Sequence, residues 1–361
     1  MAAPFALIAA GGTGGHMFPA QALAEMLLSH GWRVKLSTDD RGARYAGNFP
    51  QAVQRSVVKS ATTARGGLAG KLAAPFRIAA GVLAARRAFR KDRPDVVIGF
   101  GGYPTIPAMS AALTMGIPRM IHEQNGVMGR VNGVFAKRVN TVACGIWPTE
   151  LPAEVQGIHV GNPVRATVQA QAGAPYAPPG DGPLHLVVIG GSQGARILSD
   201  MVPTAIAGLP DDVRARLRVA HQARKEDHDR VAATYHAAGV EADIRPFFDD
   251  VPQLFADAQL VVARSGASTI ADLTVIGRPS LLIPLPTATG DHQSANARPL
   301  ADAGAALMLP ESVLDAKSLT RDILAILSDA ERASRMAAAA LSLGRPDAAR
   351  RLYDLVTELA A

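Results

Sequence analysis

The feature that most constrains the fold of this chain is a strand, glycine loop and helix pattern that occurs twice. The apolar run Phe5–Ala10 is followed by GGTGGH and by a helix expected over about residues 19–30. The run Leu184–Ile189 is followed by GGSQGA and by a helix expected over about residues 196–209. The two loops begin 179 positions apart. This pattern opens the Rossmann-like fold, so its repetition predicts two α/β domains of the same architecture.

Other short apolar runs support parallel strands that are buried on both faces. They are Val34–Ser37, Val96–Gly99, Arg119–His122, Thr141–Ala143, Arg218–Ala220, Leu260–Ala263 and Ser280–Ile283. The segment 169–183, rich in Pro, Gly and Ala, is the best linker candidate. We therefore expect one domain over residues 1–165 and another over 166–344. A break at Gly344-Arg345-Pro346 precedes a last helix, about 345–361, that we expect to pack back on the first domain.

Composition limits the class and compartment of the protein. The chain of 361 residues has a single cysteine, Cys144, which excludes an internal disulfide and favours a reducing compartment. No Cys/His cluster has the spacing of zinc ligands. The apolar start lacks the positive charge of a signal peptide, and no apolar run approaches the roughly 20 residues of a membrane span. We expect a cytoplasmic protein that is at most peripheral to a membrane.

Positive charge is concentrated in the N-terminal half. Residues 1–165 hold 19 Lys and Arg against 8 Asp and Glu, which favours an anionic partner. Residues 65–94 hold eight of these cations, interleaved with apolar side chains and opposed only by Asp92. The cations are Arg65, Lys71, Arg77, Arg86, Arg87, Arg90, Lys91 and Arg93, and the apolar residues are Leu68, Leu72, Phe76, Val82 and Leu83. A helix of this kind predicts contact with an anionic membrane, although a helix packed on the sheet with a solvated basic face is the alternative.

The glycine loops predict anion sites. Glycines between a strand and a helix let an anion approach the backbone, and the helix behind them presents free N–H groups and the positive end of its dipole. Neither loop matches G-x-G-x-x-G or a P-loop, which disfavours a dinucleotide oxidoreductase. A third candidate is Arg264–Thr269 (RSGAST), which follows a strand and opens a helix whose amides could hold a diphosphate. Asp272, one turn on, could bind ribose hydroxyls or only complement the helix dipole.

Together these motifs resemble the MurG family, the bacterial N-acetylglucosaminyltransferases of peptidoglycan precursor synthesis. The matching segments run in the family's order over roughly residues 5–305. They are Gly11–Pro19, Gly101–Tyr103, His122–Gly126 (HEQNG), Gly161–Arg165 (GNPVR), Gly190–Arg196, Phe248–Asp250, Arg264–Ala267 and Asp291–Ala297 (DHQSANA). The resemblance implies the two-domain GT-B architecture, with parallel sheets facing across a cleft that holds the active site.

The resemblance also implies an activity and its partners. The donor would be UDP-N-acetylglucosamine (UDP-GlcNAc), and the acceptor would be the C4 hydroxyl of undecaprenyl-diphosphate-linked muramoyl pentapeptide (lipid I). The product would be lipid II, with inversion at the anomeric carbon, made at the cytoplasmic face of the inner membrane. Family members need no cofactor and no tightly bound metal.

Residue roles follow from the matched motifs. Thr13, Gly14 and Gly15 lie where the family's first loop meets the donor sugar and acceptor diphosphate, and Asn125 matches a residue that contacts GlcNAc. Arg165 and Ser192 match donor nucleotide and phosphate contacts, and Phe248 falls where a backbone group recognises uracil. Ala267, Ser268, Thr269 and Asp272 match the diphosphate- and ribose-binding helix start, and Gln293 matches a sugar contact. Asp272 is a departure, because the family more often carries Glu, and the position of Gln293 could slip by one.

An inverting transfer needs a base on one side of the sugar and stabilisation of the departing UDP on the other. We expect helix amides near Ser268 and Thr269, helped by Arg165 or Arg264, to stabilise the diphosphate. His16 is the best base candidate, because it ends the first glycine loop and an imidazole titrates near neutrality. It could instead only position a phosphate or cap its helix. Glu123 is the second candidate, with fixing of the HEQN turn as its alternative role, and we expect His122 to be a packed residue.

Two other readings remain open at this stage. A sugar-nucleotide epimerase can share the architecture, but it would change UDP-GlcNAc without an acceptor. A basic membrane- or nucleic-acid-binding protein would explain the charge but not three anion-binding loops. We expect no nucleic-acid partner, because the basic segment lacks the interleaved aromatic platform that binds single strands.

Overall fold

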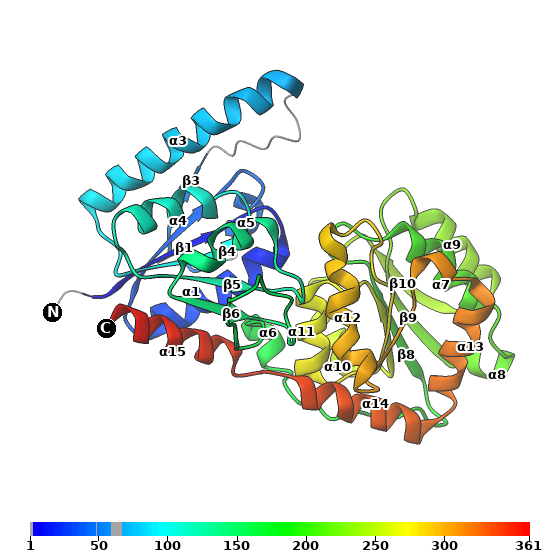
Figure 1. Ribbon diagram of the computed structural model, residues 1–361. Coiled ribbons are helices and arrows are strands. Elements are labelled where there is room, and N and C mark those ends of the chain that lie inside the picture. The colour runs from blue at the N-terminus through cyan, green and yellow to red at the C-terminus, as the bar shows by residue number, and fades with distance from the viewer. Residues whose placement is uncertain (1–2, 48, 59–66) are drawn as a thin grey trace. The chain divides into compact units, whose positions relative to one another are not determined.

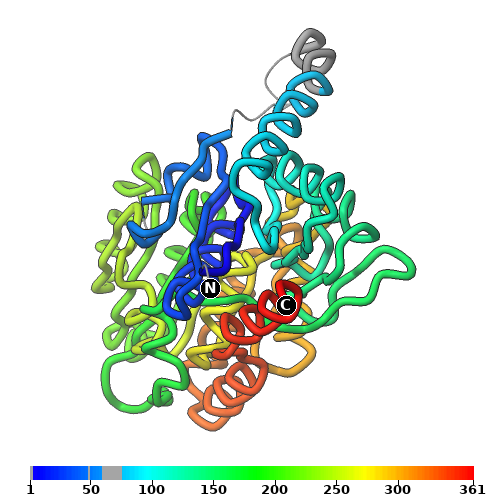
Figure 2. Tube along the Cα trace, turned by 90° about the vertical axis from the view of Figure 1, so that its left-hand side faces the viewer, coloured from blue at the N-terminus to red at the C-terminus, as the bar shows by residue number. Residues whose placement is uncertain are grey.

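The computed structural model describes residues 3–47, 49–58 and 67–361, with side chains from residue 75 onward in the last range (Figures 1 and 2). The chain divides into two compact units. Unit 1 comprises Met1–Arg165 and Pro346–Ala361, and unit 2 comprises Ala166–Arg345. Each unit is a parallel sheet covered by helices, so the predicted α/β class with two Rossmann-like sheets is confirmed.

Unit 1 has a sheet with the strand order β3-β2-β1-β4-β5-β6-β7, and all its pairings are parallel. Its strands are β1 (Phe5–Ala10), β2 (Arg33–Thr38), β3 (Gln54–Val57), β4 (Val96–Gly101), β5 (Arg119–Glu123), β6 (Thr141–Cys144) and β7 (Ile158–His159). Its helices are α1 (Gly14–Ser29), α2 (Ala43–Ala46), α3 (Gly67–Lys91), α4 (Thr105–Thr114), α5 (Arg130–Phe135), the 3₁₀ turn η2 (Ala136–Arg138) and α15 (Ala348–Ala360).

The two faces of this sheet bury alternate residues of the same strand. Ala6 and Ile8 of β1 pack under α1 and α15, and Leu352 and Val356 of α15 are fully buried there. Leu7 packs on the opposite face, beneath α4 and α5. Figure 1 shows α15, in red, along the side of α1, so the C-terminal helix completes the core of the N-terminal unit.

Unit 2 repeats the plan with the strand order β10-β9-β8-β11-β12-β13, again wholly parallel. Its strands are β8 (Leu184–Ile189), β9 (Leu217–Gln222), β10 (Glu241–Arg245), β11 (Leu260–Ala263), β12 (Ser280–Leu282) and β13 (Ala306–Met308). Its helices are α6 (Ala166–Gln169), α7 (Arg196–Ala207), α8 (Asp211–Arg214), α9 (His228–Ala237), α10 (Val251–Asp257), α11 (Ala267–Ile276), η3 (Thr289–Asp291), α12 (His292–Asp302), η4 (Glu311–Val313), α13 (Ala316–Leu327) and α14 (Ala330–Leu343).

The first helix of unit 1 differs from the expectation. The sequence predicts a loop up to about residue 19, whereas α1 begins at Gly14 and contains Pro19. Proline is disfavoured in a helix because it lacks an N–H group and crowds the preceding turn. Here Pro19 lies in the second turn and α1 accommodates it, so Gly14 and Gly15 belong to the first helical turn. First-turn N–H groups of this kind have no partner within the helix.

Candidate active site

The glycine motifs lie where the strand order of each sheet reverses. In unit 1 the reversal falls between β1 and β4, and in unit 2 it falls between β8 and β11. The GGTGGH and GGSQGA loops follow β1 and β8, while the GGY and RSGA segments follow β4 and β11. Open α/β sheets bind ligands at the carboxyl ends of strands at this switch point. The topology therefore brings the motifs of each unit together in pairs at its ligand-binding edge.

The start of α11 in unit 2 is an uncapped helix N-terminus. Gly266 is its N-cap residue and supplies no side-chain hydrogen bond. By contrast, α13 and α14 begin with Asp315 and Asp329, whose carboxylates accept from backbone amides. The hydroxyl of Ser268, in the first turn of α11, is buried and makes no hydrogen bond within the described chain. Free amides, the helix dipole and an unsatisfied hydroxyl together make a site for an anionic ligand.

One nitrogen of the Arg264 guanidinium is already engaged by other groups of unit 2. Its side chain is buried, and its Nη1 donates to the carbonyl oxygens of Ile283 (3.1 Å) and Pro284 (3.0 Å). The same nitrogen lies 2.8 Å from the carboxylate of Glu311. These contacts engage Nη1 of Arg264 at the end of β12, so of the two cations expected beside the diphosphate, Arg165 or Arg264, the geometry favours Arg165.

Gln293 lies in the first turn of α12, next to the RSGA segment. The Ser265 hydroxyl donates to the carbonyl oxygen of Gln293 over 2.8 Å, and the backbone N–H of Leu285 donates to Gln293 Oε1 over 3.0 Å. The amide of Asn296 donates to the carbonyl oxygen of Ser265 over 3.0 Å. These contacts bring the predicted sugar-contacting residue next to the predicted diphosphate site.

The second glycine loop is a tight turn that leaves its predicted ligand residue exposed. The N–H of Gly194 donates to the carbonyl oxygen of Gly191 over 3.0 Å, and both glycines have a positive φ, 68° and 86°. Residues with a side chain rarely adopt a positive φ, so glycine is required at both positions. Ser192 is exposed at the tip, and α7 begins behind it without a side-chain cap.

The other two predicted donor contacts of unit 2 are also at this edge. The side chain of Phe248 is buried, with the guanidinium of Arg245 stacked 5.2 Å from its ring centre. Asp272 is partly exposed in the second turn of α11, where a ribose bound near the first turn would come.

In unit 1 the two loops at the switch point touch. Ala10 of β1 pairs with Gly101 at the end of β4. A Cβ atom at Gly102, whose φ is 77°, would lie 2.5 Å from the carbonyl oxygen of Gly11. Only glycine allows this approach. Thr13, the N-cap of α1, makes no side-chain cap bond, so the first-turn amides of this helix are uncapped as in α11.

His16 is held in one orientation above these loops. Its Nδ1 lies 2.8 Å from the carbonyl oxygen of Gly11. A carbonyl can only accept, so Nδ1 carries the proton and Nε2 is the free base of the neutral ring. Nε2 lies 3.0 Å from the point that a Cβ atom would occupy at Gly101. In the neutral form of this half-buried ring, the nitrogen without a proton is therefore the one next to Gly101 at the end of β4.

Glu123, by contrast, is enclosed by donors. Its Oε1 accepts from the backbone N–H and the side-chain amide of Asn125, each over 3.1 Å. Its Oε2 accepts from the backbone N–H of Gly129 and the side-chain amide of Asn132, each over 2.9 Å. The carboxylate is 1% exposed. This geometry favours the alternative role foreseen for Glu123, which is to fix the HEQN turn and orient Asn125.

His122 precedes Glu123 in the same strand and is fully buried. Its Nε2 lies 3.1 Å from the carbonyl oxygen of Gly161, and its Nδ1 lies 3.1 Å from the amide of Gln124. Burial lowers the pKa of His122 to about 4, so the ring is neutral at physiological pH. The expectation of a packed histidine at the end of a strand is confirmed.

Arg165 is positioned by an aromatic residue that the motif analysis did not single out. Its guanidinium lies over the ring of Phe18, 4.7 Å from the ring centre, and this ring meets Tyr45 edge-on at 5.8 Å. Phe18 follows the first glycine loop in α1, and an aromatic residue so close to the loop was the signal available in the sequence. The stacking places a cation beside the first helix of unit 1.

The basic helix α3 exposes much of its surface. The side chain of Phe76 is 79% exposed and that of Leu83 is 53% exposed. Arg77, Arg87, Arg90, Lys91 and Arg93 are exposed as well. Asp92, the one acid of the segment, pairs with Arg33 over 2.9 Å. Arg65 lies outside the described residues, as do the side chains of Leu68, Lys71 and Leu72.

Figures 1 and 2 show α3, in cyan, along the side of unit 1 next to α4. Within the described residues, every helix is too short or too polar to serve as a membrane span. In the same part of the chain, no three His, Cys, Asp or Glu side chains are grouped as a metal site requires.

Comparisons with known proteins give a consistent picture. Residues 6–144 match the glycosyltransferase family 28 N-terminal domain, and residues 185–352 match the glycosyltransferase family 28 C-terminal domain. A relative from Caulobacter vibrioides is 49% identical over 98% of this chain and 99% of its own length. It is named UDP-N-acetylglucosamine--N-acetylmuramyl-(pentapeptide) pyrophosphoryl-undecaprenol N-acetylglucosamine transferase.

Solved structures agree. The crystal structure of Acinetobacter baumannii MurG matches with a TM-score of 0.81 and 29% identity, covering 98% of this chain and 99% of that one. A UDP-N-acetylglucosamine 2-epimerase from Listeria monocytogenes, described as putative in its structure title, matches with a TM-score of 0.66 at 14% identity, over 99% of this chain and 96% of its own. The likeness to the epimerase extends to the fold alone.

Proposed function

The chain belongs to glycosyltransferase family 28, and from this membership we propose that it transfers N-acetylglucosamine from UDP-GlcNAc to the C4 hydroxyl of lipid I, forming lipid II. The enzyme is a UDP-GlcNAc-dependent hexosyltransferase of peptidoglycan synthesis. The observation that carries the proposal is the pairing of glycine motifs with uncapped helix starts at the switch point of each sheet. A nucleotide diphosphate and a lipid diphosphate each need such a group of backbone donors.

We assign the nucleotide to unit 2. The first-turn amides of α11, at Ala267, Ser268 and Thr269, bind the diphosphate, and the Ser268 hydroxyl becomes satisfied on binding. The backbone at Phe248 recognises uracil, and Asp272 accepts from the ribose. The support is the uncapped start of α11 and the unpartnered Ser268 hydroxyl.

Four further donor contacts follow from the matched motifs: Ser192 and Gln293 belong to unit 2, and Arg165 and Asn125 belong to unit 1. Ser192 and Arg165 contact the nucleotide and its phosphates, and Asn125 and Gln293 contact the sugar hydroxyls. When the bond from the anomeric carbon to the diphosphate breaks, negative charge grows on the leaving oxygen. Helix amides that already point at that oxygen stabilise the charge without reorganising.

Unit 1 supplies the base. Nε2 of His16 accepts the proton of the C4 hydroxyl while that oxygen bonds to the anomeric carbon of GlcNAc and UDP leaves from the opposite face. Thr13, Gly14 and Gly15 hold the acceptor diphosphate and the donor sugar with the first-turn amides of α1. Glu123 keeps Asn125 in place, and its four hydrogen bonds leave it no lone pair directed at a substrate.

The direct test is a transfer assay with labelled UDP-GlcNAc and a soluble lipid I analogue. We expect label in the glycolipid with the acceptor and unchanged UDP-GlcNAc without it. Conversion of UDP-GlcNAc in the absence of acceptor would instead identify an epimerase. His16→Ala is expected to lower kcat at least about tenfold with the fold intact. The control is His30→Ala, at the exposed far end of α1, which should leave kcat within about twofold of wild type.

We further propose that α3 holds the enzyme on an anionic membrane, at the cytoplasmic face of the inner membrane. Exposed cations around Phe76 and Leu83 suit a surface of acidic headgroups. Each such cation contributes about 1 kcal/mol, so the double change Arg77→Glu and Arg87→Glu should weaken vesicle binding by about 30-fold or more. The measurement is sedimentation with phosphatidylglycerol vesicles at low salt.

The matched control for the membrane proposal reverses two exposed cations of α13, Lys317→Glu and Arg321→Glu. These changes alter the net charge equally but lie in unit 2. If both double variants lost binding to the same degree, general charge would account for the attraction and α3 would not be the membrane-binding helix.

A further inference from the structure

The carboxyl end of β9 contacts the second glycine loop. Gln222, the last residue of β9, is 5% exposed. Its Oε1 accepts from the N–H of Gly190 over 3.0 Å, and its Nε2 donates to the carbonyl oxygen of Gly191 over 3.0 Å. Nε2 also lies 3.3 Å from the carbonyl oxygen of Pro246, two residues before Phe248. One buried amide therefore joins the glycine loop to the segment assigned to uracil.

Within the described residues, the backbone hydrogen bonds that leave Gly190–Gly194 both end on Gln222. The remaining one is the internal bond between Gly194 and Gly191. The loop carries exposed Ser192 and has two residues with positive φ, so little else restrains its shape. Gln222 is thus the principal polar restraint on a loop that must present its backbone accurately.

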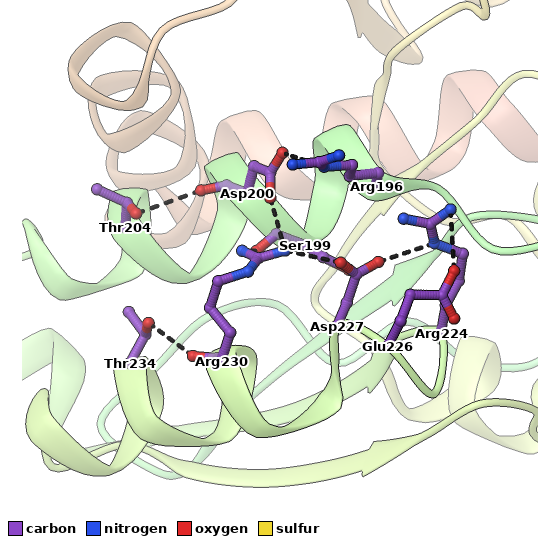
Figure 3. A network of polar contacts seen from close by, with 9 residues as sticks. All are labelled: Arg196, Ser199, Asp200, Thr204, Arg224, Glu226, Asp227, Arg230 and Thr234. Atoms are coloured by element: carbon purple, nitrogen blue, oxygen red, sulfur yellow. Dashed lines mark hydrogen bonds and ion pairs between the residues drawn. The ribbon is translucent and has the colours of Figure 1, made fainter.

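Arg224, two residues further on, covers the other end of the loop. A Cβ atom at Gly194 would lie 2.6 Å from Cγ of Arg224, so the aliphatic part of the arginine lies directly on the glycine. The guanidinium is held in turn by Asp227 over 2.8 Å and by Glu226 over 3.2 Å, as Figure 3 shows. The position of the arginine side chain is therefore fixed at both of its ends.

Asp227 binds this arginine instead of capping its own helix. It is the N-cap residue of α9, where an Asp side chain ordinarily accepts from a first-turn amide, but it makes no cap bond. Its carboxylate, 6% exposed, accepts instead from Arg224 and Arg230 (Figure 3). Burial opposes ionisation of this carboxyl, and the two guanidinium groups outweigh burial, so the pKa of Asp227 is lowered. An N-cap carboxylate that binds two arginines instead of capping its helix indicates that the position of those arginines matters more than the stability of the helix end.

We propose that Gln222 and Arg224 are positioning residues for the nucleotide donor. Gln222 sets the backbone of the second glycine loop relative to the Phe248 segment, and Arg224, held by Asp227, fixes Gly194 and hence the approach to α7. Neither side chain needs to touch the substrate. The inference rests on the proposed function, because it takes the second glycine loop as part of the UDP-GlcNAc site.

The decisive variant is Gln222→Glu. It keeps an acceptor for the N–H of Gly190 but turns the donor nitrogen into an oxygen that faces the carbonyl oxygens of Gly191 and Pro246. We expect the KM for UDP-GlcNAc to rise at least about tenfold, with the KM for the lipid I analogue within about twofold of wild type. Arg224→Ala is the second variant and should raise the donor KM about threefold or more. Arg224→Lys keeps the aliphatic chain and the charge, so it should restore most of the loss.

The matched control uses the same chemistry at the other edge of the same sheet. Gln259 is 6% exposed, its Oε1 accepts from the N–H of His185 over 2.6 Å, and its Nε2 donates to Ala177 over 3.1 Å. Gln259→Glu should lower the Tm as much as Gln222→Glu does and leave the donor KM unchanged. Asp200→Asn, which neutralises one of the two carboxylates that pair with Arg230, should also leave the donor KM unchanged.

Calorimetry with UDP separates the possible failures. If wild-type protein did not bind UDP, the donor site and this inference would both be wrong. If wild type bound UDP and Gln222→Glu and Arg224→Ala bound it equally well, the donor site would stand and the positioning role would be refuted. If Gln222→Glu and Gln259→Glu lowered the Tm equally and neither changed the KM for UDP-GlcNAc, Gln222 would stabilise the fold without positioning the donor.

Discussion

Glu123→Gln distinguishes a positioning carboxylate from a catalytic base. The carboxylate accepts four hydrogen bonds, two on each oxygen, from Asn125, Gly129 and Asn132. In glutamine, the new NH₂ group faces two of those donors whichever way the amide turns. Two hydrogen bonds to a buried carboxylate are lost, at about 1–3 kcal/mol each. We therefore expect unit 1 to lose about 2–6 kcal/mol of stability, although the substitution hardly changes the side chain's volume.

The assay combines thermal unfolding with steady-state kinetics. The Tm should fall by roughly 4 °C or more. The KM for UDP-GlcNAc should rise, because the turn that carries Asn125 loses two of the four hydrogen bonds that fix it on Glu123. The control is Glu150→Gln, whose backbone pairs with Gly126 and Met128 of the same turn while its side chain is exposed. A Glu123→Gln enzyme with wild-type Tm and donor KM but a kcat reduced by a thousandfold would refute the reasoning and make Glu123 the base.

Three further predictions concern buried groups. Arg278 is 1% exposed and donates to the carbonyl oxygens of Ala174, Phe255 and Ile276. Arg278→Met should therefore lower the free energy of unfolding of unit 2, measured in urea, by about 3 kcal/mol or more. A loss below about 1 kcal/mol would contradict this expectation. Burial lowers the pKa of His221 to about 3 in the folded protein, against about 6.5 in the unfolded chain. Between pH 3 and pH 6.5 the unfolded chain therefore binds more protons than the folded protein. The contribution of His221 to the free energy of unfolding is therefore fully present above pH 6.5 and falls by about 1.4 kcal/mol per pH unit toward pH 3. His221→Gln should reduce this pH dependence when the free energy of unfolding is measured in urea at each pH. Gly102→Ala should lower kcat about tenfold or more, because the new Cβ atom would displace the Gly11 carbonyl oxygen that orients His16. A variant with the kcat of wild type would show that catalysis does not depend on this orientation.

The central strands could be predicted from the sequence because they are buried on both faces. β1, β4 and β11 read as unbroken apolar runs and β8 as a run interrupted only by His185, and the glycine-rich segments that follow them mark the switch points. Edge strands lack this signal. β10, with the sequence EADIR, alternates between exposed and half-buried residues, and β3 is mostly exposed. Only pairing with a neighbour makes such segments strands, so the expected strands omit β3, β7, β10 and β13.

The site could be predicted only where a motif is local. The loops after β1, β8 and β11 carry their chemistry within a few residues, and the structure brings them to the expected sheet edges. Contacts between distant segments could not be foreseen. The guanidinium of Arg264 turns to carbonyl oxygens some 20 residues away, and Gln222 meets a loop about 30 residues upstream. The available signal for Gln222 was a polar residue at the carboxyl end of a strand that flanks β8.

The central claim is that unit 2 holds a nucleotide diphosphate on the backbone amides at the start of α11. A crystal structure of the protein with UDP-GlcNAc tests it most directly. The account predicts phosphate oxygens at about 2.7–3.2 Å from the amides of Ser268 and Thr269, with uracil against the backbone at Phe248. A uridine bound in unit 1, or phosphates that make no contact with α11, would contradict it.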